Sequence, residues 1–127
     1  MSYLADSRVH LDKAREFLES ARDECDFERY KAAVSAAVIS GINSKDVICL
    51  KATRRTTKTE NHNEAVRELR LSGPAGASLE TTFRRLLALK PKSQNQASSV
   101  SSASARDAVS WAQRMYDVAV EVVSRPS

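Results

Sequence analysis

One short stretch brings together residue types that can do acid–base and phosphate chemistry. It is Arg54–His62, RRTTKTENH, which holds one of the two histidines in the chain. Arg55 and His62 are separated by six residues. An arginine that stabilises charge and a histidine that moves protons could form half of a metal-free ribonuclease site, with Arg55 and His62 as catalytic residues. The structural alternative is a polar loop that leads into a helix, with His62 half-exposed in its first turn.

Asn43 and Asp46 are candidate supporting residues for this site. They lie three residues apart and therefore share one face of a helix. A carboxylate at Asp46 can orient Arg55 or His62. The alternative, which we favour, is an exposed pair whose carboxylate meets neighbouring basic side chains in solvent. We expect the other histidine, His10, to be a surface residue.

The basic side chains concentrate in the middle third of the sequence. Residues 51–92 carry ten basic and four acidic side chains, whereas residues 1–50 carry seven and nine. Such a surplus suits a polyanion such as RNA or a nucleotide, or an acidic partner. Equal weight goes to the alternative that these charges form solvated helix faces. The candidate binding residues are Arg54, Lys58, Arg84, Arg85, Lys90 and Lys92.

Several other kinds of site have no sequence signal. Cys25 and Cys49 lack CxxC spacing, which predicts small buried thiols kept reduced rather than a disulfide or metal site. We expect no metal and no cofactor. The N-terminal MSYLADSRVHLDKAREF is charged where a signal peptide is apolar, and no apolar run approaches the roughly 18 residues that span a membrane. These features predict a cytoplasmic protein without membrane contact.

The elements that must position these residues are helices. Alanine is abundant, β-branched alternation is absent, and only three glycines and three prolines occur in 127 residues. We predict a single all-α domain, an up-and-down bundle of four to five helices, with a flexible low-complexity loop at 94–104. The predicted helices are Ser7–Glu24, Phe27–Thr53 capped by Asp26, His62–Leu71 opened by an Asn61/Glu64 capping box, Leu79–Lys90 capped by Ser78, and one from Ser102 or Ser104 to Ser124.

Two of these helices have unusual faces. The second carries small residues at helical spacing, and Gly41 among them predicts close approach of a neighbouring helix. The last helix has two adjacent apolar rows, one through Trp111 and one through Tyr116. A helix with so much apolar surface is either central in the bundle or shared with another subunit, and for a chain of this length we expect a homodimer.

The order of these pieces resembles the HEPN superfamily. The resemblance is carried by KAREFLESA, by ERYKAAVSAAVISGINSKDVICL, by the basic loop with NHNEAVRELR, and by the short helix ending in LLALK. It spans about Arg8 to Val123. It implies a dimeric helical bundle in toxin–antitoxin or defence systems, with an antitoxin or a nucleotidyltransferase-like protein as partner, acting on RNA or nucleotides.

In that family, an Arg, four to six intervening residues and a His usually precede the final helices. The resemblance implies that the His moves protons while a ribose 2′-hydroxyl attacks the neighbouring phosphate, and that the Arg stabilises the developing charge. Here the corresponding segment, LALKPKSQN, contains Lys90 and Lys92 but no histidine. The motif is therefore degenerate, and Arg55 with His62 lies one helix earlier.

Three functions follow from these patterns. The first is a HEPN-like dimer that binds RNA or a nucleotide through residues 51–92, with ribonuclease activity weak or lost. The second is a protein–protein interaction or regulatory module without nucleic-acid binding. The third is an active metal-independent ribonuclease toxin that uses Arg55 and His62.

Overall fold

The chain folds into α-helices only, in the part that the structure describes. The computed structural model describes residues 2–90 and 99–126, and it confirms the predicted all-α bundle. The helices are α1 (Tyr3–Asp26), α2 (Tyr30–Thr53), α3 (His62–Leu71), α4 (Pro74–Ala77), α5 (Glu80–Ala88) and α7 (Ser102–Ser124).

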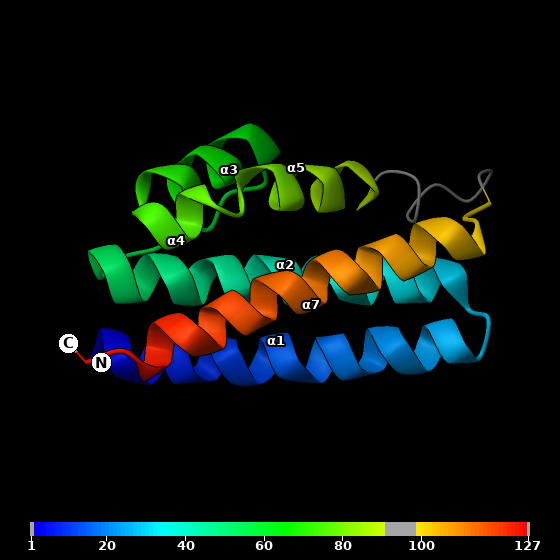
Figure 1. The fold of residues 1–127 in the computed structure, drawn as a ribbon, viewed down its shortest axis with the longest axis horizontal. Coiled ribbons are helices and arrows are strands. Elements are labelled where there is room, and N and C mark those ends of the chain that lie inside the picture. The colour runs from blue at the N-terminus through cyan, green and yellow to red at the C-terminus, as the bar shows by residue number, and fades with distance from the viewer. Residues whose placement is uncertain (1, 91–98, 127) are drawn as a thin grey trace.

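The helices are arranged in two layers. The long helices α1, α2 and α7 pack against one another, with α7 crossing diagonally in front of the other two in Figure 1, and the shorter α3, α4 and α5 cover one side of α2. Helix α2 contacts every other described helix. Because other helices surround it, α2 has no distinct polar face. The C-terminal part of α2, which leads into Arg54, therefore lies between the long helices and the short ones.

Small residues on α2 allow this close packing, as the sequence predicts. Ala33, Ala37, Ser40 and Ser44 have no solvent exposure. A Cβ atom at Gly41 would lie 2.5 Å from Cδ2 of Leu86 on α5 and 3.4 Å from Sδ of Met115 on α7. Because real Cβ atoms do not approach other atoms to 2.5 Å, Gly41 is the residue that lets Leu86 of α5 pack this closely on α2, whereas the contact with Met115 is an ordinary one.

Helix α7 lies within the bundle and still exposes part of its second apolar row. It packs against α1, α2 and α5, and Ala108, Ala112 and Met115 are fully buried. Trp111 is partly buried against the core, as an aromatic side chain in a helical stripe is expected to be. Val120 of the second row is 39% exposed. Packing against three helices therefore accounts for most of the apolar surface of α7, and the homodimer stays a prediction.

Several predicted helix ends are wrong by a few residues. Helix α1 begins at Tyr3, because Ser2 caps it by accepting from the amide of Ala5. Asp26 is the last residue of α1 and does not cap α2. Ser78 donates to the carbonyl of Ala75 at 2.6 Å and so ends α4 instead of opening α5. The Ser78 side chain, which suits an N-cap, is used here to close the preceding helix.

The predicted flexible loop at 94–104 is only partly described. Residues 94–98, like the candidate binding residue Lys92, lie outside the described residues. Ser102–Ser104 belong to α7, because the hydroxyl of Ser101 accepts the amide of Ser104 at 3.0 Å and caps the helix. The helix start predicted at Ser102 is therefore confirmed, and the loop prediction is wrong for Ser102–Ser104.

One helix among the described residues is long and apolar enough to span a membrane by length and composition alone, and the cytoplasmic location stays a prediction. This helix is α2, with a mean hydropathy of 1.3 over the window tested. Of that window, 83% is buried inside the bundle, and the core helix of a globular fold meets the same test. The helices that cover α2 account for its apolar character.

Candidate functional site

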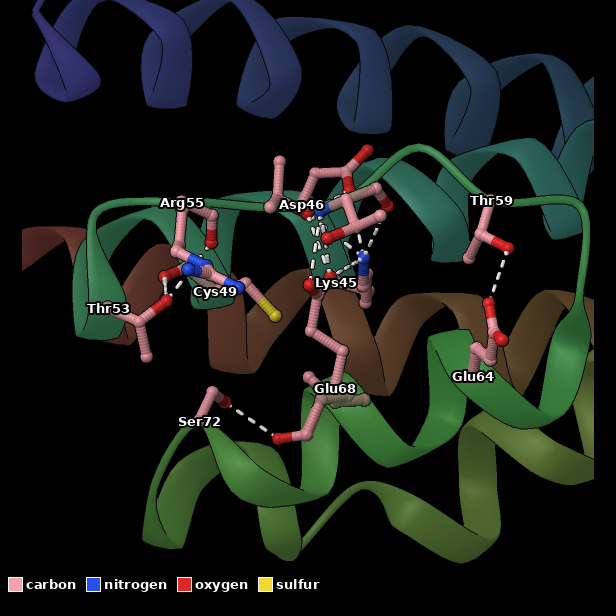
Figure 2. A network of polar contacts seen from close by, with 12 residues as sticks. Lys45, Asp46, Cys49, Thr53, Arg55, Thr59, Glu64, Glu68 and Ser72 are labelled. Atoms are coloured by element: carbon pink, nitrogen blue, oxygen red, sulfur yellow. Dashed lines mark hydrogen bonds and ion pairs between the residues drawn. The ribbon is translucent and has the colours of Figure 1, made fainter.

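An extended segment, residues 54–61, connects α2 to α3, and we call it the strap. The chain leaves α2 at Arg54, which adopts a left-handed conformation with φ of 62°. The strap then runs back along the bundle to Asn61 (Figures 1 and 2). Asn61 caps α3 by accepting the amide of Glu64 at 3.1 Å, as predicted. The Glu64 carboxylate accepts the hydroxyl of Thr59 instead of returning to Asn61, so the capping box is half formed.

A buried lysine holds the strap against the bundle. Lys45 on α2 is only 2% exposed and forms an ion pair with Glu68 on α3. Its ammonium also donates to Oγ1 of Thr56 at 2.9 Å and to the carbonyl of Thr57 at 3.2 Å. The amide of Thr57 in turn donates to Oε1 of Glu68 at 3.0 Å. Figure 2 shows Lys45 and Glu68 meeting beside the strap, which therefore joins α2 to α3.

Asp46 and His10 continue the network toward α1. Asp46 Oδ1 accepts the hydroxyl of Thr56 at 2.6 Å, and Oδ2 lies 3.6 Å from Nδ1 of His10. The same Nδ1 lies 2.8 Å from Oδ1 of Asn43, whose amide nitrogen donates to the carbonyl of Ile39. Because this assigns the acceptor oxygen of Asn43 to the imidazole, Nδ1 of His10 carries the proton.

Two sequence predictions about these residues are wrong. His10 is 9% exposed and is not a surface residue. Asn43 and Asp46 are 8% and 5% exposed, so they are not an exposed pair. Within the described chain, Asp46 accepts hydrogen bonds from Lys45 and Thr56 rather than from Arg55 or His62.

The network changes the acidity of two neighbouring groups. Burial by itself raises the pKa of the Glu68 carboxyl, but hydrogen bonds from Lys45 and Thr57 outweigh it, and the net pKa is lowered. Burial raises the pKa of the Cys49 thiol to about 12, which Lys45 only partly offsets. Glu68 is therefore an anion at neutral pH, and Cys49 is a neutral thiol.

A pocket of about 400 Å³ opens beside the network, and we call it the His62 pocket. Asn43, Lys45 and Asp46 line its buried end. Its apolar wall comes from α2, α3 and α5 and includes the buried Phe83 and Leu87. Its outer rim consists of Lys13, Lys58, Glu60, His62 and Lys90. Five predicted site residues thus line one pocket, together with Lys13 of α1; they are Asn43, Asp46, Lys58, His62 and Lys90.

Arg55 lies elsewhere. It lines a second pocket of about 380 Å³ with Thr53, Glu64, Arg67, Glu68 and Leu71, and the His62 pocket does not include it. Figure 2 shows Arg55 beside Thr53, at the opposite end of the strap from Thr59. A single chain therefore does not bring Arg55 and His62 into one pocket.

The other predicted binding residues that the structure describes, Arg54, Arg84 and Arg85, are spread over the surface. The guanidinium of Arg54 stacks over the Tyr3 ring, 5.1 Å from its centroid. Arg84 pairs with Glu80 at 3.0 Å on the exposed side of α5. Arg85 is exposed on the same helix. None of the three lines the His62 pocket.

Lys45, Lys13 and His10 were missed as candidates. The sequence holds one signal for the first, since Lys45 and Asp46 are the only charged residues between Lys31 and Lys51. Charges inside such an apolar helix are buried only when paired. Lys13 has no comparable signal, because only the packing of α1 against α2 brings it to the pocket.

Comparison with known proteins assigns no family. No protein-family model matches the sequence, and a search of curated proteins gives no match. Among the described residues, no group of three or more His, Cys, Asp or Glu side chains is arranged to hold a metal ion. The functional argument therefore depends on the His62 pocket itself.

Proposed function

We propose that this protein is a HEPN-like helical bundle that binds the phosphates of a nucleotide or RNA at the His62 pocket. The observation that carries the proposal is that three lysines converge on one rim. Lys13 comes from α1, Lys58 from the strap, and Lys90 from just after α5. In the described part of the chain, neither Lys13 nor Lys58 has an ion-pair partner. Their charge is therefore available to an anion.

The size and lining of the pocket support the same ligand class. A volume of about 400 Å³ lies within the roughly 300–1,000 Å³ range of small-ligand sites. The half-buried Ile42 and Ala65 provide apolar surface for a base, while the rim provides the cations that phosphate requires. Assembly as a homodimer, with an antitoxin or nucleotidyltransferase-like partner, belongs to the same proposal.

Ribonuclease activity is not part of the proposal, because Arg55 and His62 line different pockets. Only a second copy of the chain can bring one protein's Arg55 to another's His62. The comparison of wild type with His62→Ala on labelled RNA tests this alternative: cleavage that the variant lacks would establish it.

The binding experiment uses purified protein, labelled RNA and adenosine 5′-monophosphate (AMP) at two salt concentrations. Lys13→Gln and Lys58→Gln are each expected to weaken binding severalfold and to reduce the salt dependence. Arg8→Gln is the matched control, since it removes an exposed charge from α1 outside the pocket. Equal weakening in all three variants indicates a nonspecific charge effect and contradicts the proposal.

The protein-interaction module is the second candidate. Its contacts would use apolar side chains that lie in solvent, of which Phe27 at 70% and Leu71 at 65% are the most exposed. A protein of this class shows no salt-sensitive binding of RNA or AMP. Absence of both interactions in the same experiment would select it.

A further inference from the structure

The two ends of the His62 pocket differ in burial and in charge. The outer end carries Lys13 and Lys58, both exposed, and Lys90, which is half-buried. At the inner end, Lys45 is 2% and Asp46 is 5% exposed. An elongated ligand therefore meets different chemistry at its two ends.

Lys45 has no hydrogen left for a ligand. An ammonium has three donor hydrogens. Four acceptors already surround Lys45 Nζ, namely Oδ1 of Asp46 at 3.4 Å, Oγ1 of Thr56 at 2.9 Å, the carbonyl of Thr57 at 3.2 Å, and Oε1 of Glu68. The ammonium of Lys45 at the inner end is thus fully hydrogen-bonded to Asp46, Glu68 and the strap, and it has no donor left for a phosphate.

Asp46 keeps acceptor capacity. An ionised carboxylate offers about four lone-pair positions. Oδ1 accepts from Thr56 at 2.6 Å and faces Lys45, while Oδ2 lies 3.6 Å from His10, which is longer than a hydrogen bond. A buried carboxylate with unfilled acceptor positions repels phosphate and favours hydroxyl or amino donors.

We infer that Asp46 is a specificity-determining residue, which orients a bound nucleotide with its phosphate at Lys13 and Lys58 and a donor group of its sugar or base toward the inner end. This inference rests on the proposed function and deepens it. The ligand class is a phosphate monoester whose far end carries hydrogen-bond donors. A phosphate that lacks these donors, such as inorganic phosphate, contacts only the lysines of the rim.

The test measures the dissociation constants of three probes, AMP, inorganic phosphate and adenosine, by titration calorimetry. Asp46→Asn is expected to weaken AMP and adenosine about tenfold but not to weaken phosphate, whose binding stays equal or tightens because a negative charge is removed from the pocket. Lys58→Gln is expected to weaken AMP and phosphate and to leave adenosine unchanged. Thermal unfolding of each variant verifies that the fold is intact.

A second measurement on the wild-type protein holds even if Asp46→Asn does not fold. It compares 4-aminophenyl phosphate with 4-methylphenyl phosphate, which have the same charge and similar shape but differ in the donor at the far end. Binding of the amino compound at least threefold more tightly supports the inference. Equal affinities overturn it.

The outcomes separate the inference from the proposed function. If AMP binding depends on Lys58 but Asp46→Asn binds AMP and adenosine as wild type does, the inference is wrong and the proposed function stands. If Asp46→Asn weakens phosphate as much as AMP, Asp46 acts on the pocket as a whole, and the inference is again wrong. If neither AMP nor RNA binds to the wild type, the proposed function fails and the inference fails with it.

Discussion

The ammonium of Lys45 on α2 forms an ion pair with the carboxylate of Glu68 on α3, and together they enclose Thr56 and Thr57 of the strap. The same strap supplies one wall of the His62 pocket. The pair therefore links the packing of α3 on α2 to the shape of the proposed binding site.

Glu68→Ala is expected to destabilise the protein by about 2–3 kcal/mol, because it removes the main anionic partner of a lysine that is 2% exposed. The loss lies below the largest values for buried pairs because the Glu68 side chain is 24% exposed and Lys45 keeps Asp46. Urea unfolding gives the measurement. Arg84→Ala, which breaks an exposed pair with Glu80, is the control and should cost less than about 1 kcal/mol. Equal losses would show that the buried Lys45–Glu68 pair contributes no more to stability than an exposed pair.

The stabilisation by the Glu68 carboxylate is expected to depend on pH. Its folded-state pKa is lowered from 4.5, so below pH 4.5 the unfolded chain binds a proton more readily than the folded one. The contribution is therefore complete above pH 4.5 and declines as the pH falls through the folded-state pKa. The difference in unfolding free energy between wild type and Glu68→Gln should shrink over that acidic range. Glu16→Gln removes an exposed carboxylate from α1 and controls for net charge; the same shrinkage there would argue against a specific effect.

Gly41→Ala is expected to destabilise the protein although alanine favours helix. The added Cβ would lie 2.5 Å from Leu86, whose side chain is fully buried and cannot move aside freely. Overpacking costs about 1–3 kcal/mol, against about 1 kcal/mol gained in helix propensity. Chemical denaturation of Gly41→Ala, Leu86→Ala and the double variant measures the coupling. The double variant should be more stable than the sum of the single losses predicts, and strict additivity would contradict the contact.

The two thiols are expected to react differently in the folded protein. With a pKa of about 12, Cys49 has roughly one thiolate in ten thousand molecules at pH 8, and it is also fully buried. Cys25 is only partly buried and lines a pocket between α1 and α7. Mass spectrometry after brief alkylation should show one modified cysteine in the native protein and two in denaturant. Rapid native modification at Cys49 would mean that α2 is less well covered than described.

Local signals in the sequence were enough for several elements. Asn61 was expected to open α3, and it does, because an N-cap hydrogen bond needs only residues within one turn. Gly41 was expected at a close helix contact, and that contact is present. In contrast, Asp26 and Ser78 also suit an N-cap, but each belongs to the end of the preceding helix. The chemistry of a cap side chain does not say which neighbouring helix it serves.

The sequence by itself determined that this protein is helical, where α3 begins, and that a basic loop follows the most apolar helix. Only the tertiary structure decided that His10, Asn43 and Asp46 are buried and that Lys13 joins His62 while Arg55 does not. The physical reason lies in α2. Helices from both layers pack against α2, so its polar residues have no solvent-exposed face. They therefore pair with groups from distant parts of the chain. Those pairings depend on how the helices pack, and no spacing within one segment encodes them.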